Sequence, residues 1–178
     1  MHPLCLIFLL AGCPGPSFTD PCASDQFACD QSTDAFQLDP SCKLTGTLSV
    51  EAGQGETAYA PLAAGESIVI HHGSQGGIHT VLALRVTNAA LDVYDKLKVR
   101  LALTIDDGKT IIGDRTLVLG AKKAVRVAVD GAVEEFGIVT FLDWWPTDRT
   151  RTLTVTVTDP CGRVGTAEHV IPASPPSG

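Results

Sequence analysis

Aromatic residues are scarce in this chain: they make up 6% of its 178 residues, and only one methionine is present. A hydrophobic core must therefore be built mainly from valine, leucine, isoleucine and alanine. The hydrophobic fraction is nevertheless 44%, against 19% charged residues. This balance argues against a disordered chain, and the length suits one domain.

Runs of basic residues are also missing. Lysine and arginine total 13 against 20 aspartate and glutamate residues, the formal net charge is −7, and the densest basic pair is Lys122-Lys123. Such a chain repels phosphate backbones, so we expect no nucleic-acid partner. None of the six cysteines forms a C-x-x-C pair, which argues against a zinc ribbon or a thioredoxin-type site.

The apolar stretch near the N-terminus, Leu4–Leu10, is short. A membrane-spanning helix needs about 20 apolar residues, so this stretch does not qualify. A short apolar run followed by small residues is typical of an export signal. We therefore expect residues 1–12 to be a signal peptide.

The residues that end this segment, Leu10-Ala11-Gly12-Cys13, resemble the lipobox of bacterial lipoproteins. The resemblance implies cleavage before Cys13, a diacylglycerol on the Cys13 thiol, and an acyl chain such as palmitate on the new amino group. Each buried acyl CH₂ contributes about 0.8 kcal/mol, so these chains would anchor the protein to a membrane. By the same resemblance, Pro14 in place of aspartate favours the outer membrane over the cell membrane.

A polar segment separates this motif from the rest of the chain. Residues 13–40 are rich in Asp, Ser, Pro, Gly, Gln and Cys and keep no period of 2 or 3.6. This composition predicts a lipidated N-terminus followed by a flexible tether. We expect the folded domain to span residues 41–172 and residues 173–178 to be a disordered tail.

Four cysteines remain after removal of the signal and lipidation of Cys13. They are Cys22, Cys29, Cys42 and Cys161. An even number in an exported protein implies disulfides, with three connectivities open. We favour Cys22–Cys29, which flank a short polar loop, and Cys42–Cys161, which would close a loop of over a hundred residues.

Hydrophobic and polar residues alternate along four segments of the domain: 44–50, 97–105, 124–129 and 152–158. A period of two indicates strands with one buried face, and in the third segment it places Val125, Val127 and Val129 on that face. Asp107-Gly108 between two such runs predicts a hairpin. The sequence thus predicts an all-β fold, a single immunoglobulin-like antiparallel β-sandwich of about eight strands. This similarity is architectural and implies no activity.

Three histidines flank a glycine-rich loop. His71 and His72 end one expected strand, Gly73–Gly77 form the loop, and His79 begins the next strand. In a hairpin, His71 and His79 would approach each other. Imidazoles suit copper, zinc or nickel, and an oxidising exported compartment suits Cu(II). His71, His72 and His79 are therefore candidate ligands of copper or zinc.

The same loop is a candidate recognition site for a protein. Gly76 and Gly77 expose backbone, and Gln75, His79 and Arg85 offer hydrogen-bond donors to a partner.

Trp144 and Trp145 follow an apolar strand and are a candidate stacking platform for a sugar. The alternative is that at least one of the two rings covers the open end of the sandwich.

The leading hypothesis is an exported, lipid-anchored cell-envelope protein that acts as a structural or protein-binding module, without catalysis and without a cofactor. The alternatives are a copper-type metal-binding protein and, third, a carbohydrate-binding module.

Overall fold

The computed structural model describes residues 36–91, 93, 96–120 and 126–174. They all belong to the second of the two units into which the chain divides, Gln31–Gly178. Several predicted features lie outside the described residues: the signal peptide, the lipidation at Cys13, most of the tether, the Cys22–Cys29 disulfide and the end of the tail. Within the described part, no helix has the length and apolarity needed to cross a membrane.

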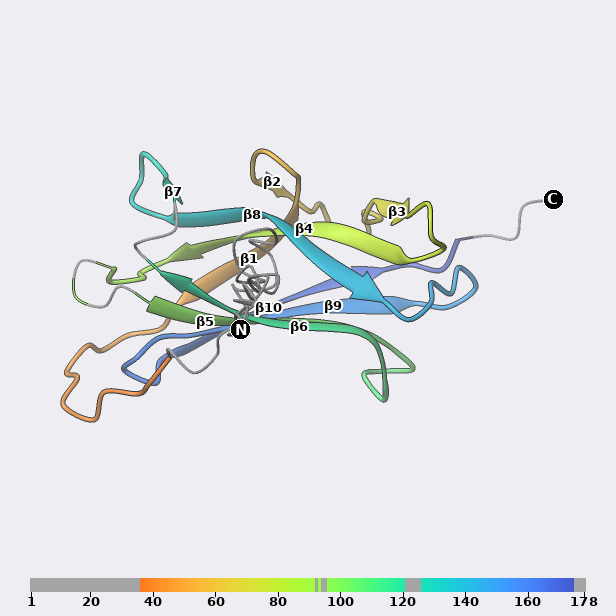
Figure 1. The fold of residues 1–178 in the computed structure, drawn as a ribbon. Coiled ribbons are helices and arrows are strands. Elements are labelled where there is room, and N and C mark those ends of the chain that lie inside the picture. Colours follow the sequence, from red (N-terminus) through yellow and green to blue (C-terminus); the bar gives the residue numbers. More distant parts are fainter. Residues whose placement is uncertain (1–35, 92, 94–95, 121–125, 175–178) are drawn as a thin grey trace, which may run out of the picture. The chain divides into compact units, whose positions relative to one another are not determined.

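The described residues form two antiparallel sheets that lie face to face (Figure 1). The six-stranded sheet has the order β2-β1-β4-β8-β7, with β3 also paired to β4, and the four-stranded sheet has the order β10-β9-β5-β6. The strands are β1 Ser49–Gln54, β2 Ala60–Pro61, β3 Ile70–His72, β4 Ile78–Thr87, β5 Lys96–Ile105, β6 Thr110–Gly120, β7 Arg126–Val127, β8 Val133–Leu142, β9 Arg151–Thr158 and β10 Val164–Ile171. The predicted all-β antiparallel sandwich is confirmed.

Aliphatic side chains from both sheets fill the space between them. Alternate positions of β5 and β9 are fully buried, as their period of two predicts. These side chains pack against those of β4 that point into the space between the sheets, which are also fully buried. The residues concerned are Leu82, Leu84, Val86, Leu97, Val99, Leu101, Leu103, Leu153, Val155 and Val157. The core is thus built almost entirely from leucine, isoleucine and valine.

The predicted hairpin at Asp107-Gly108 joins β5 to β6. Asp106 and Asp107 have φ angles of 54° and 56°, and Gly108 has a φ of 83°. Aspartate and glycine tolerate this left-handed region better than most residues do, which explains why they occupy the turn. The backbone N–H of Lys109 donates to the carbonyl of Asp106 and closes it.

The strand expected over residues 44–50 begins only at Ser49. Leu48 and Val50 do face the core, so the expected side-chain alternation is correct at this end. The preceding residues lack strand pairing because they are fastened instead to the turn between β9 and β10.

The strand expected over residues 124–129 was predicted wrongly. In the described part of this segment, residues 126–129, only Arg126–Val127 is a strand, β7, and its one partner among the described strands is β8. Val127 is 64% exposed and Val129 is fully exposed, while Val125 lies outside the described residues. A short strand at the end of a sheet has a neighbouring strand on one side only, and here Val127 and Val129 stay exposed to solvent. The alternation of hydrophobic and polar residues therefore does not mark a buried face in this segment.

At two glycines, a strand of one sheet lies close against a segment of the other. A Cβ atom on Gly113 would lie 2.5 Å from Leu142 Cδ2, and one on Gly165 would lie 2.7 Å from the Leu48 carbonyl oxygen. At the first seam, the backbone N–H of Asp143 donates to the carbonyl of Ile112 over 2.9 Å. Because glycine has no side chain, the backbone of β6 can approach β8 closely at one position, and the backbone of β10 can approach β1 closely at the other.

Candidate functional site

A row of rings crosses the outer face of the six-stranded sheet. His71 on β3 is the register partner of His79 on β4, which in turn is the partner of Phe141 on β8. The imidazole centroids are 5.2 Å apart with nearly parallel planes, and His79 lies 6.1 Å from the Phe141 ring. We call these three residues, with the adjacent Glu56, the histidine surface.

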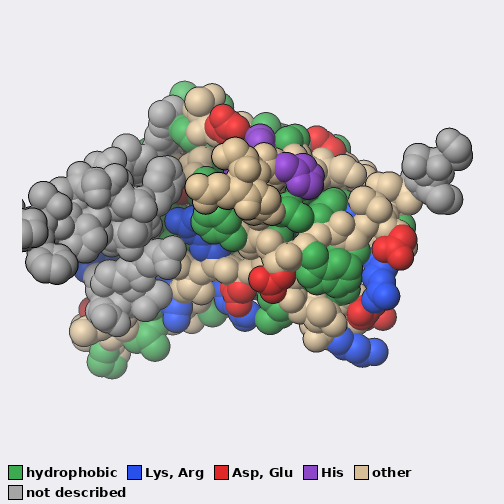
Figure 2. Space-filling model, turned by 45° about the vertical axis from the view of Figure 1, so that its right-hand side comes forward, with side chains coloured by type: hydrophobic (Ala, Val, Ile, Leu, Met, Phe, Trp, Pro, Cys, Tyr) green, Lys and Arg blue, Asp and Glu red, His purple; other side chains and the backbone are tan. Residues whose placement is uncertain are grey.

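The histidine surface is open to solvent. Phe141 is 71% exposed. Glu56 also faces solvent, and its Oε1 lies 3.9 Å from His71 Nε2. Figure 2 shows histidine side chains on the surface of the molecule among hydrophobic, uncharged and acidic groups. An exposed phenylalanine beside two imidazoles can contact a partner through both apolar and polar atoms.

The structure brings together two of the three predicted metal ligands. His72 follows His71 directly, so strand alternation turns its side chain to the other side of β3. Another histidine, His169, lies on β10 in the other sheet, where its Nε2 is 2.7 Å from the carbonyl oxygen of Glu66. Among the described residues, no group of three or more histidine, cysteine, aspartate or glutamate side chains is arranged to hold a metal ion.

The glycine-rich loop forms as predicted, but it does not include Arg85. The Gly73 N–H donates to the Gly77 carbonyl, the Gly76 N–H donates to the Gly73 carbonyl, and Gln75 is exposed at the tip. Arg85 lies seven positions further along β4 than Ile78, toward the other end of the strand. The predicted recognition set of Gln75, Gly76, Gly77, His79 and Arg85 is therefore split between the two ends of β4.

Arg85 instead belongs to an ion-pair network on the outer face. Its guanidinium bonds to the carboxylates of Glu134 (2.6 Å) and Asp130. The Asp130 carboxylate also accepts the backbone N–H of Ala132, and this bond together with Arg85 holds the pKa of Asp130 below its usual value. These charges link β4 to β8 and its preceding turn.

The two adjacent tryptophans occupy different environments. Trp145 packs against the core, and the guanidinium carbon of Arg151 lies 4.6 Å from its ring centroid. Arg151 is 1% exposed, and burial lowers its pKa. It donates to the carbonyls of Pro146 and Pro172, which ties the β8–β9 connection to the C-terminal segment. Trp144 is 43% exposed, so one of the two rings, not both, is available to a sugar.

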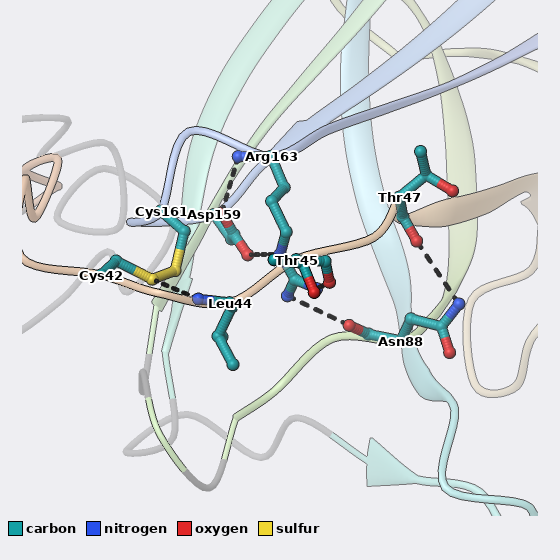
Figure 3. Close-up of polar contacts among 8 residues, drawn as sticks. All are labelled: Cys42, Leu44, Thr45, Thr47, Asn88, Asp159, Cys161 and Arg163. Atoms are coloured by element: carbon teal, nitrogen blue, oxygen red, sulfur yellow. Dashed lines mark hydrogen bonds and ion pairs between the residues drawn. A yellow bond between two sulfur atoms is a disulfide. The ribbon is translucent and has the colours of Figure 1, made fainter.

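A disulfide and a cluster of hydrogen bonds join the segment before β1 to the turn between β9 and β10 (Figure 3). We call the Cys42–Cys161 disulfide and the Asp159–Arg163 pair, with their backbone partners, the clasp. Cys42 and Cys161, 119 residues apart in sequence, form a disulfide, in agreement with the favoured pairing. The Leu44 N–H donates to Cys42 Sγ over 3.4 Å, and the Asp39 N–H donates to the Pro160 carbonyl over 2.7 Å. The segment before β1 is therefore bound to the turn between β9 and β10.

Arg163 forms the polar half of the clasp. Its Nε donates to Asp159 at 2.6 Å, and the two side chains are 10% and 3% exposed. Its other nitrogens donate to the carbonyls of Thr45 and Asn88. The side-chain amide of Asn88, a residue with a φ of 63°, donates a hydrogen bond to the Thr47 carbonyl oxygen (Figure 3). One largely buried guanidinium thus joins the entry segment, the β9–β10 turn and the residue that follows β4.

Sequence reasoning missed this polar cluster and the buried Arg151. Asp159 and Arg163 stand four residues apart in a turn, a spacing that is equally common in exposed pairs. Only the neighbouring Cys161 marks the segment as one that is fastened to another part of the chain.

No protein-family model matches this chain, and no curated protein matches it. The candidate sites are therefore interpreted from their own geometry.

We expect replacement of Cys42 and Cys161 by serine to destabilise the domain strongly. The disulfide closes a loop of 119 residues, and the chain-entropy relation assigns such a loop about 4–5 kcal/mol. Urea unfolding followed by tryptophan fluorescence measures the change. Wild-type protein reduced with dithiothreitol should unfold at the same urea concentration as the double variant, and an unchanged midpoint in the double variant would contradict this assignment.

Replacing Arg163 by methionine should lower the free energy of unfolding by about 3 kcal/mol, because it leaves the buried Asp159 carboxylate without its charge partner. The matched control is Arg100→Met, since Arg100 forms an ion pair with Asp114 in which both side chains are more than a third exposed. The control should cost less than about 1 kcal/mol. Equal effects in the two variants would show that the clasp contributes no more than a surface pair.

Proposed function

We propose that the protein is an exported lipoprotein, anchored through Cys13, that presents its β-sandwich as a protein-binding module of the cell envelope without catalysing a reaction. The observation that carries the proposal is the combination of the lipobox-like Leu10-Ala11-Gly12-Cys13 with a disulfide between Cys42 and Cys161. Structural disulfides persist in oxidising compartments outside the cytosol, where a lipoprotein signal would deliver the chain.

The clasp supports this arrangement. An anchor at Cys13 would attach the domain to the membrane through the residues that precede Leu44. The Cys42–Cys161 disulfide and the Arg163 contacts join that segment to β9 and β10, which pair with each other along eight residues. Tension on the tether would therefore act on paired strands of the four-stranded sheet as well as on the start of β1.

The architecture is also suited to binding. Two-sheet sandwiches are common in cell-surface domains, which bind partners through exposed faces, edges and loops. Here the histidine surface presents Phe141 at 71% exposure on the outer face of the six-stranded sheet. A binding role requires such an exposed surface and no catalytic group.

Metabolic labelling of the full chain in a bacterial host tests the anchor. An alkyne analogue of palmitate should label the wild-type protein, and the Cys13→Ala variant should lose the label and leave the membrane fraction. Cys5→Ala is the control, because Cys5 would depart with the signal peptide and its loss should leave labelling unchanged. Labelling that persists in Cys13→Ala, or is absent from the wild type, would refute the lipoprotein assignment.

A second candidate function is binding of Cu(II). The observation that favours it is the register pairing of His71 with His79, which places two imidazoles side by side with Glu56 Oε1 3.9 Å from His71 Nε2. Metal–nitrogen bonds are about 2.0–2.1 Å long and lie in the ring plane. The stacked rings would therefore have to rotate before both could ligate one ion.

Isothermal titration of the full chain with CuCl₂ tests this function. Cu(II) binding should disappear in His71→Ala and in His79→Ala, because each removes one of the two neighbouring imidazoles. His72→Ala, on the other side of β3, is the matched control and should bind as the wild type does. Equal loss in all three variants, or no binding by the wild type, would rule out the paired site.

A further inference from the structure

A pocket lies at one edge of the sandwich, between β1 of the six-stranded sheet and β10 of the four-stranded sheet. Its volume is about 370 Å³. At one end Gly165 brings β10 against Leu48, and at the other His169 Nε2 meets the carbonyl oxygen of Glu66. The pocket is thus bounded along β10 and opens to solvent at the sheet edge. We call it the edge pocket.

The floor of the edge pocket is apolar. Val50 and Ala52 reach it from β1, Leu62 from the segment after β2, and Ala167 from β10. All four side chains are half-buried and pack against the core. A ligand that fills the pocket would therefore remove aliphatic surface from water, which favours binding.

The lining also includes two carboxylates and a phenol. Glu51 and Glu168 are exposed residues that alternate with the floor residues along β1 and β10. The Tyr59 hydroxyl donates to Glu51 Oε2 at 3.2 Å. Burial and the neighbouring Glu51 raise the pKa of Tyr59 to about 12, so the phenol stays neutral at physiological pH. No lysine or arginine of the described chain forms an ion pair with Glu51 or Glu168.

Both strands beside the pocket have incomplete pairing. Among the strands that the structure describes, β10 pairs with β9 on one side only, and the outer side of β1 pairs with β2 only at Gly53 and Gln54. The backbone of Val50 and Glu51 thus borders the pocket without a neighbouring strand. Edges of this kind can accept an extended segment from another chain.

We propose that the edge pocket binds a lysine or arginine side chain presented by an extended segment of a partner protein. The aliphatic stem of such a side chain matches the apolar floor, and its cation matches the carboxylates of Glu51 and Glu168. The formal net charge of −7 would favour approach of a basic partner. This inference rests on the proposed protein-binding role and names the partner chemistry for it.

The probes are three dye-labelled pentapeptides that differ only at the central residue of Thr-Val-Lys-Val-Thr. The second carries norleucine there, which keeps the stem and removes the charge, and the third carries glutamate. Fluorescence anisotropy with the full chain in detergent micelles should show the lysine peptide binding about tenfold more tightly than the norleucine peptide and the glutamate peptide binding least. Equal affinity for lysine and norleucine would overturn the proposal.

Variants locate the site. Glu51→Gln and Glu168→Gln should each weaken the lysine peptide about three- to tenfold and leave the norleucine peptide unchanged, because they remove charge and little volume. Ala167→Phe should block both peptides by filling the floor, with its fold verified by the urea midpoint. Asp107→Asn, at the turn between β5 and β6, is the matched control and should bind as the wild type does. A loss in Asp107→Asn equal to that in Glu168→Gln would show non-specific charge attraction and overturn the site.

The two proposals fail separately. If no peptide binds at about 1 mM while the Cys13 thiol is still acylated, the edge pocket is not the docking site and the anchor remains. If the peptides bind but Cys13 carries no lipid, the pocket is supported and the lipoprotein assignment is refuted.

Discussion

The layer of leucine, isoleucine and valine side chains between the two sheets determines which positions of every strand face solvent. Because strand side chains alternate, a register slip of one residue would turn an entire buried row outward. Burial of Leu82, Leu84 and Val86 therefore also places His79 and Arg85 on the outer face of β4. The surfaces available for binding are a consequence of this core.

The sandwich has two edges at which one sheet meets the other, and the contact between the sheets differs at the two edges. On one side β6 lies against the end of β8, where Gly113 permits contact and Arg115 donates to the carbonyl of Val139. On the other side β10 lies against Leu48 and Val50 at Gly165, and further along a pocket lies between β10 and β1. The unequal closure explains why the apolar floor of the edge pocket reaches solvent on the β1–β10 side.

The clasp lies beside this second seam. Arg163 and the Cys42–Cys161 disulfide hold the entry segment against the β9–β10 turn, and Gly165 follows two residues later at the start of β10. The same turn thus fixes the position of the incoming chain and the start of one pocket wall. In a protein anchored as we propose, the tether would be fastened at this end of the domain, while the histidine surface lies on the outer face of the other sheet.

Local patterns in the sequence were sufficient for the all-β class, the long strands β5 and β9 and the hairpin at Asp107-Gly108, because alternation and turn chemistry depend on neighbouring residues. The Cys42–Cys161 pairing followed from the positions of the cysteines relative to the expected strands. Tertiary structure decided the rest. It left Val127 and Val129 exposed at an edge, brought Arg85 to the carboxylates of Glu134 and Asp130, and formed the edge pocket from β1 and β10. The pocket joins strands more than a hundred residues apart, and no local period records which strands become neighbours or which one ends a sheet.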